Sequence, residues 1–196
     1  MRGKCQSVEI LKRFQTEKYK YLALPMFIVF ISLVLKFAGA DIRISQTSAI
    51  SGFLLYLFLL RLLRVSRIGD EHSDNIIYSP IYGSVSEISS RKDFTEIKIK
   101  KNIFMPVDVR STSAGDVFKK DKKEIINKTT GVSWKSASGK IKILDPATQN
   151  SVGVLFGIIP FKAEIKIKIP AKYEITIKEN DKVESGETEI GRINES

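Results

Sequence analysis

Histidine and cysteine are almost absent from this sequence of 196 residues, which holds one of each. The single cysteine, Cys5, cannot form a disulfide within the chain, and one histidine with one cysteine cannot build a His/Cys metal centre. The histidine, His72, lies in a polar segment and is expected to be a solvated linker residue. The sequence also lacks a P-loop, a G-x-G-x-x-G motif after a strand, H-E-x-x-H and G-x-S-x-G. Nothing therefore points to a common nucleotide-binding, metallopeptidase or serine-hydrolase site.

Acidic residues are scarce in the first third of the chain. Residues 1–69 hold 11 of the 32 Lys and Arg but only 3 of the 22 Asp and Glu, a net charge of +8. Residues 70–196 hold the remaining 21 and 19, a net charge of +2. A nucleic-acid-binding domain would need its cations clustered on a folded face, and the downstream region is nearly balanced. We expect no nucleic-acid partner.

Two long apolar runs follow the basic start of the chain. The first, residues 21–40, contains one charged residue, Lys36, and the second, residues 48–67, has its three arginines near the end. About 20 apolar residues are enough for a helix to cross a bilayer. We therefore expect a two-helix transmembrane hairpin over residues 21–67. The alternative is a helical hairpin buried in a soluble core.

The distribution of Lys and Arg orients this hairpin. A basic tail, residues 1–20, holds six of them, whereas the polar loop expected at residues 41–47 holds only Arg43. Flanks rich in Lys and Arg stay in the cytoplasm. We therefore expect both termini in the cytoplasm and the chain in the inner membrane. A polar linker, residues 68–75, then leads to a domain at the cytoplasmic face.

Residues 76–196 have the pattern of strands and turns, without a convincing amphipathic helix. Alternation of apolar and polar residues predicts half-buried strands and is clearest in residues 163–169 and 173–177. Residues 152–161 are almost continuously apolar and are expected to form a central buried strand. Further strands are predicted at residues 76–78, 83–88, 96–104, 131–134 and 140–144. The predicted fold class is mainly β, with two N-terminal transmembrane helices and one β domain built as a sandwich or barrel.

Three short motifs stand in order along the β region. They read SPIYGSV at residues 79–85, IFMPVDVR at residues 103–110 with AGDV at residues 114–117, and DKVESGETEIG at residues 181–191. A doubled lysine before the second motif, Lys100-Lys101, is expected to shift the phase of its strand. The third motif resembles the hairpin of barrel-sandwich hybrids.

In this order, behind a two-helix anchor, the motifs resemble the short, membrane-anchored form of the phosphatidylserine decarboxylases. The resemblance implies a barrel-sandwich-hybrid-like β domain over residues 76–196, a role in phospholipid metabolism and an oligomer. Members of this family make a pyruvoyl cofactor from an internal serine when the chain cuts itself at a Gly-Ser bond, and this group is the electron sink for decarboxylation. A histidine oriented by an aspartate activates that serine.

The residues that the resemblance requires for catalysis are replaced in this chain. Tyr82 stands at the position of an aspartate and Arg110 at that of the histidine, and arginine stays protonated and cannot act as a base. The Gly-Ser bond is expected after Ile193, where the sequence reads Asn194-Glu195-Ser196. We therefore predict no catalytic, cofactor-binding or metal-binding residue and no pyruvoyl group.

The sequence leads to one main hypothesis and two alternatives. The main hypothesis is a non-catalytic, decarboxylase-like protein that binds membrane phospholipid, associates with itself or pairs with an active paralogue. One alternative is a subunit or truncated piece of an active decarboxylase with a separate serine-bearing chain, and the other is an assembly subunit of a membrane complex. Cations that could contact anionic headgroups, or simply form a solvated face, are Lys100, Lys101, Arg110, Lys119 and Lys120.

Overall fold

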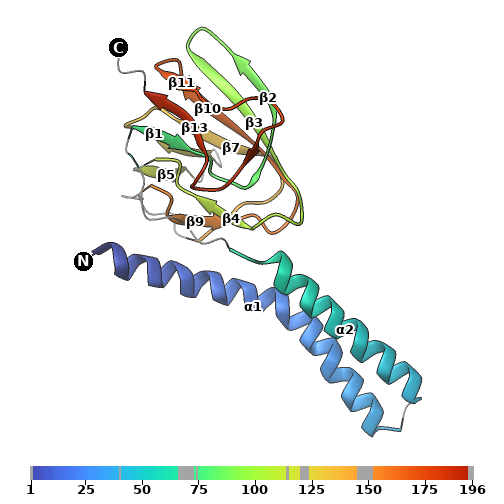
Figure 1. Ribbon diagram of the computed structural model, residues 1–196. Coiled ribbons are helices and arrows are strands. Elements are labelled where there is room, and N and C mark those ends of the chain that lie inside the picture. The colour runs from blue at the N-terminus through green and yellow to red at the C-terminus, as the bar shows by residue number, and fades with distance from the viewer. Residues whose placement is uncertain are drawn as a thin grey trace.

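The computed structural model describes residues 2–39, 41–65, 73, 75–113, 115–119, 124–144 and 152–193, with side chains described from residue 10 onward except at 117–119. Two helices, α1 (Arg2–Phe37) and α2 (Ile42–Leu62), precede the β domain, which stands over one end of their hairpin (Figure 1). The strands are β1 (Ile76–Tyr78), β2 (Gly83–Ser90), β3 (Phe94–Lys101), β4 (Asp108–Arg110), β5 (Asp116–Lys119), β6 (Glu124–Asn127), β7 (Ser133–Ser138), β8 (Lys142–Ile143), β9 (Leu155–Ile158), β10 (Ala163–Pro170), β11 (Tyr173–Ile175), β12 (Lys182–Val183) and β13 (Glu189–Ile193).

The two helices pack against each other through small and polar residues. The hydroxyl groups of Ser32 and Ser48 are hydrogen-bonded at 2.8 Å, and Ser45 Oγ donates to the carbonyl oxygen of Ser32 at 2.9 Å. A Cβ atom at Gly52 would lie 2.9 Å from a methyl group of Val29. Small residues at such positions let helices approach closely in an apolar environment.

Large apolar side chains cover the outside of this hairpin. Phe27 and Phe30 on α1, and Ile50 and Leu54 on α2, are each about 60% exposed. Only 17% and 11% of the most apolar windows of α1 and α2 are buried within the protein. The soluble-core alternative does not fit this exposure, because core helices bury such residues. Both helices are long and apolar enough to cross a membrane, as predicted.

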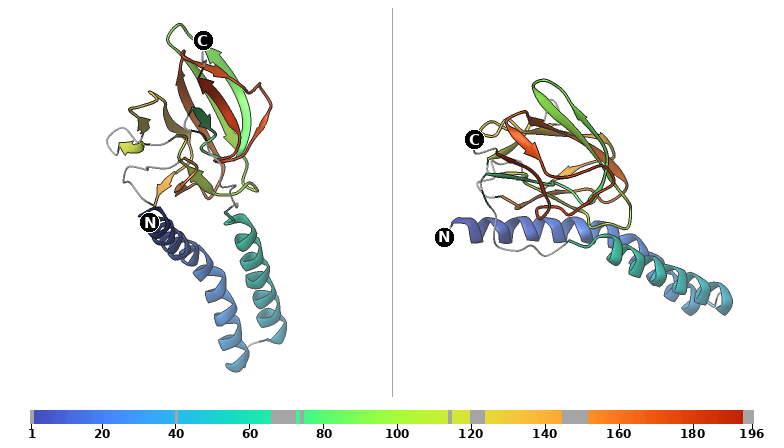
Figure 2. Two further views of the ribbon diagram at one scale, coloured as in Figure 1. Left: turned by 60° about the vertical axis from the view of Figure 1, so that its left-hand side comes forward. Right: turned by 45° about the horizontal axis from the view of Figure 1, so that its top comes forward.

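The boundaries of the helices differ from the predicted ones. α1 is continuous from Arg2, so the predicted basic tail is helical, and α2 begins at Ile42 inside the predicted loop. The carboxylate of Asp41 accepts a hydrogen bond from Arg43 N at 2.8 Å and caps α2, which explains the early start. α1 bends between the part beneath the β domain and the part beside α2 (Figure 2), and Pro25 is the proline inside this helix.

Three antiparallel sheets form the β domain. The strand orders are β12-β2-β3-β10-β7-β6-β5, β1-β13-β11 and β4-β9-β8. In the largest sheet β10 is the middle strand, and it pairs along its whole length with β3, Ala163 opposite Lys101 and Pro170 opposite Phe94. The prediction of a mainly β domain is confirmed, although no sheet closes into a barrel within the described parts of the chain.

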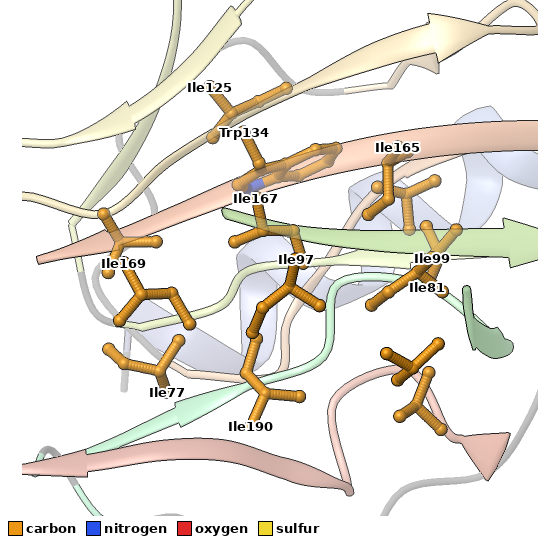
Figure 3. Packing of buried hydrophobic residues seen from close by; sticks show 14 of the residues in the cluster. Ile77, Ile81, Ile97, Ile99, Ile125, Trp134, Ile165, Ile167, Ile169 and Ile190 are labelled. Carbon is orange, nitrogen blue, oxygen red and sulfur yellow. The ribbon is translucent and has the colours of Figure 1, made fainter. Parts of the chain in front are cut away.

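Isoleucines fill the core of the β domain (Figure 3). Successive side chains of a strand face opposite ways, so the Ile-Lys alternation of β3 and β10 places each isoleucine inside. The isoleucines buried in this way are Ile97, Ile99, Ile165, Ile167 and Ile169. Trp134 of β7 completes the cluster. The continuously apolar segment forms β9, whose four residues are all buried in the middle of its sheet, as predicted.

Alternation does not predict the short strands β4, β5, β6, β12 and β13. The hairpin prediction for the third motif is wrong, because β12 pairs with β2 while β13 pairs with β1 and β11. The motif therefore links two sheets. Two of its three partners, β1 and β2, lie about a hundred residues earlier in the chain, and the local pattern contains no information about them.

Candidate functional site

The three motifs of the β region meet at Pro80. The carbonyl oxygen of Pro80 accepts hydrogen bonds from the backbone N of Arg110 at 2.9 Å and from Ser185 Oγ at 2.8 Å. Beside it, Gly186 N donates to the carbonyl oxygen of Ser79 at 2.7 Å. Each motif thus supplies backbone or hydroxyl groups to one junction, although they are widely separated in the sequence.

Arg110 is held inside the domain by an ion pair with Asp108. Its Nε atom lies 2.7 Å from Asp108 Oδ2, and its Nη1 atom donates to the carbonyl oxygen of Gly153 at 3.0 Å. The two side chains are 8% and 0% exposed. They lie on the same face of β4 because they are two residues apart. A buried pair of this kind holds its charges in place, because removing either partner leaves the other uncompensated.

Lys101 is a second buried cation, on the inward face of β3. The prediction that the doubled lysine shifts the phase of the strand is wrong. The buried positions continue through Ile97, Ile99 and Lys101, which are all at most 1% exposed. Lys100 points outward, and its Nζ lies 4.0 Å from a carboxylate oxygen of Glu164. β3 therefore has a lysine where the alternation requires an apolar residue.

The ammonium group of Lys101 joins two loops of the β domain. Its Nζ atom donates to the carbonyl oxygens of Asn102 at 3.3 Å and Met105 at 3.2 Å in one loop, and of Phe161 at 3.4 Å in the other. Burial lowers the pKa of Lys101 to about 8, against the opposing effect of the Asp108 carboxylate. We call residues 102–107 the Phe104 loop and residues 159–162 the Phe161 loop.

Each of these loops carries an exposed aromatic ring that contacts the helical hairpin. Phe104 is 63% exposed and Phe161 is 49% exposed. The Phe104 ring lies 6.3 Å from that of Phe58 on α2, and the Phe161 ring lies 6.4 Å from that of Tyr21 on α1, both edge to face. Figure 2 shows the β domain standing directly over this end of the hairpin.

The first half of α1 forms the floor of the β domain. Ile10 and Phe14 are buried there, and Arg13 Nη1 donates to the carbonyl oxygen of Leu144 at 3.0 Å. The apolar partners of these two residues include Val107, Leu155 and Ile158. The predicted basic tail is thus a packing surface, and the four-residue spacing of Ile10 and Phe14 is its sequence signal.

A second buried carboxylate, Asp116, lies in the turn after the second motif. It accepts hydrogen bonds from Thr112 N at 2.7 Å, from Thr112 Oγ1 at 2.9 Å and from Asn127 Nδ2 at 3.0 Å. Burial raises the pKa of Asp116, and the hydrogen bonds from Thr112 and Asn127 oppose this rise. Gly115 has a φ of 90°, a conformation that favours glycine. Gly115 and Asp116 of the AGDV sequence are therefore explained by the structure of this turn.

The remaining predicted contacts with headgroups are only partly described. Lys100 is exposed on the surface, whereas Lys101 and Arg110 are buried. Lys119 ends β5, with its side chain outside the description, and Lys120 and His72 lie outside the described residues. Tyr82 is half-buried. Direct headgroup contact by Lys100 stays a prediction.

Nothing in the comparisons with known proteins identifies the chain. No family model, no curated protein and no solved structure matches it. Among the described residues, no group of three or more His, Cys, Asp and Glu side chains could hold a metal ion. The function is therefore inferred from the geometry of the chain itself.

Proposed function

We propose that the protein is a membrane-anchored, non-catalytic relative of the phosphatidylserine decarboxylases, with a barrel-sandwich-like β domain that binds phospholipid at the cytoplasmic face of the inner membrane. The observation that carries this proposal is the meeting of the three motifs at Pro80. If the three motifs shared only their order with the family, they would not need to lie together in the fold. If they build one site, they must lie together.

The ion pair of Arg110 supports the non-catalytic part of the proposal. Serine activation needs a base that can accept a proton. The guanidinium at this position is permanently charged and is paired with Asp108 at 2.7 Å. Tyr82 offers no carboxylate at the other position. The Arg110–Asp108 pair therefore has the geometry of a buried structural ion pair and not that of a catalytic base.

The two helices and their basic ends support the membrane part of the proposal. Arg61 in the last turn of α2 and Arg64 just after it are exposed near the β domain. At the opposite end of the hairpin, Arg43 is the single basic residue between residues 41 and 60. This asymmetry favours a β domain on the cytoplasmic side, where anionic headgroups attract cations.

The test is the mass and chemistry of the full chain purified in detergent. We expect one chain of 22.1 kDa that forms no adduct with borohydride and amine and releases no carbon dioxide from phosphatidylserine. An active short-form decarboxylase, treated in parallel, is the positive control. Native mass spectrometry should detect bound phospholipid on the same preparation. A pyruvoyl adduct, turnover, or a lipid-free protein would contradict the proposal.

A further inference from the structure

We propose that the Phe104 loop and the Phe161 loop insert into the bilayer surface, with their two aromatic rings at the boundary between headgroups and acyl chains. The partner is the leaflet that the hairpin itself enters. This inference rests on the membrane-anchor part of the proposed function. It does not depend on the resemblance to decarboxylases.

The length of α2 determines the depth of Phe104. α2 has 21 residues, which correspond to about 32 Å at the rise of an α-helix. A hydrocarbon core is about 30 Å thick, so almost all of α2 is needed to cross it, and any tilt shortens its reach further. Phe58 is four residues before the end of the helix at Leu62, roughly 6 Å inside it. The Phe104 ring, which contacts Phe58, therefore lies at the edge of the hydrocarbon core.

The length of α1 gives the same depth for Phe161. The helix ends at Phe37, and the stretch that starts at Tyr21 is about 26 Å long. Because this is shorter than the hydrocarbon core, α1 must enter the lipid at or before Tyr21. The Phe161 ring contacts Tyr21 and so lies at the same level as Phe104. Two independent helices thus place both loops at one depth.

The chemistry of this surface suits the bilayer interface. A cavity of about 50 Å³ lies between the Phe104 loop and α2, lined by Phe58, Arg61, Leu62 and Phe104. Aromatic rings with a cation at the rim are typical of the headgroup region. Arg64 is exposed beside them, and so is Lys162 in the Phe161 loop. The two rings contact Tyr21 and Phe58 on helices whose outer residues are apolar and exposed, which favours lipid over a protein partner.

Lys101 holds the two loops in this arrangement. Its ammonium donates to carbonyl oxygens in both loops, which ties them to each other and to the end of β3. A lysine buried in a domain is unfavourable unless its donors are used, and here its three acceptors are all loop carbonyls. The two rings are therefore held in place before any contact with lipid, so insertion requires no ordering of the loops.

The experiment measures the depth of single labels on the full chain in phosphatidylcholine–phosphatidylglycerol vesicles. In a Cys5→Ser background, Phe104→Cys and Phe161→Cys are labelled with an environment-sensitive fluorophore. Phe30→Cys, near the middle of the stretch of α1 from Tyr21 to Phe37, is the control for the anchor, and Ser90→Cys, at the distant end of the β domain, is the aqueous control. Lipids with nitroxide groups near the headgroup or deep in the chains serve as quenchers, and iodide serves as the aqueous quencher.

We expect the labels at both loops to lose most of their fluorescence to the shallow nitroxide and little to iodide. Phe30→Cys should respond to the deep nitroxide and Ser90→Cys to iodide alone. Labels at Asn102→Cys and Lys162→Cys leave both rings intact and should also respond to the shallow nitroxide. This second pair keeps the test valid if replacing a ring disturbs its loop.

Three results would overturn the inference, each in a different way. Loop labels that behave like Ser90→Cys, while Phe30→Cys is quenched by lipid, would refute insertion and leave the anchor intact. Loop labels protected from both quenchers would indicate a protein cover. A Phe30→Cys label that no lipid quenches would refute the membrane anchor, and with it this part of the proposed function.

Discussion

The paired strands β3 and β10 have different surroundings at their two ends. At the end far from the helices, Phe94 is covered by cations, with Arg91 Cζ 5.5 Å and Lys168 Nζ 5.1 Å from the centre of its ring. At the near end, beyond Lys101, Phe104 is 63% exposed. Among the described residues, the one aromatic ring that it contacts is that of Phe58 on the hairpin. An aromatic ring shielded by charged side chains suits water, and a bare one suits lipid.

Charges are arranged in the opposite way at these two ends. At the far end Arg91 is exposed, and midway along β2 and β3 Glu87 and Lys98 form an ion pair of 2.6 Å on the surface, with side chains 47% and 24% exposed. At the near end Lys101, Asp108 and Arg110 are all buried. The near end therefore presents two aromatic rings outward and buries three charged side chains, although Arg64 and Lys162 remain exposed beside the rings, which differs from an ordinary water-facing loop.

The largest effect is expected from breaking the buried charges of the near end. Asp108→Ala leaves Arg110 and Lys101 buried without their anion, and should lower the free energy of unfolding by about 3–5 kcal/mol. Thermal unfolding of the full chain in detergent, followed by circular dichroism, measures this loss. The matched control is Glu87→Ala, which removes an anion from the exposed pair and should leave the transition unchanged. Equal transitions for both variants would show that the near-end pair is energetically unimportant.

The next effect is a dependence of stability on pH that belongs to Lys101. The pKa of Lys101 is about 8 in the folded chain against an ordinary value of 10.5. Between pH 8 and 10.5, this lysine therefore binds more protons in the unfolded chain than in the folded chain. Stability from this group is therefore constant below pH 8 and rises from pH 8 to 10.5, by on the order of 3 kcal/mol. Unfolding measured across this range should show the rise in the native chain.

The control for this prediction is the neighbouring lysine. Lys101→Met should remove the rise between pH 8 and 10.5, whereas Lys100→Met, which alters an exposed lysine on the opposite face of β3, should retain it. A rise that persists in Lys101→Met would assign the effect to other groups.

A smaller effect is expected when the apolar character of the near end is weakened. Phe104→Ser removes a ring whose transfer from water is worth about 1–2 kcal/mol when it is partly covered. A label at Lys162→Cys in this variant should lose part of its quenching by shallow nitroxide lipids. Phe94→Ser, at the far end, should leave that quenching unchanged. If both substitutions act alike, the two ends do not differ in their contact with lipid.

The smallest effect is expected at the far end itself. Phe94→Leu keeps an apolar side chain but removes the interaction of Arg91 and Lys168 with the ring, which is worth about 0.5–1 kcal/mol at an exposed site. Thermal unfolding should show a small decrease, and the decrease should be absent when Arg91→Gln and Lys168→Gln are already present. A full decrease in that background would attribute it to lost packing.

The sequence predicts the parts of the fold that repeat a simple period. The isoleucines of β3 and β10 are found on the buried face, and the continuous apolar run becomes β9. The two apolar helices are also found in place. In these cases the period of the side chains alone determines which face is buried, so no knowledge of distant partners is needed.

The candidate site is harder to predict because its partners are far apart in the sequence. The spacing of two positions from Asp108 to Arg110 indicates a common face, yet a hydrogen bond that holds Arg110 inside is accepted by the carbonyl oxygen of Gly153, 43 residues away. Lys101 contradicts the apolar pattern that surrounds it, and one of its three acceptors, the carbonyl of Phe161, is 60 residues away. A charged residue at a position where the alternation requires an apolar one is therefore a signal for a buried site. The sequence pattern does not show which groups accept its hydrogen bonds.

One helix is both long and apolar enough to cross a membrane and packed beneath the β domain. α1 extends without interruption from beneath the domain to the far end of the hairpin, so a hairpin inserted in a membrane would hold the domain at a fixed height above the lipid, instead of the variable reach of a flexible tether. A lipid that meets this surface arrives by lateral diffusion within the leaflet, and its effective concentration is that of a two-dimensional solution. The composition of the surrounding membrane, more than any affinity measured in free solution, would then determine how often the surface is occupied.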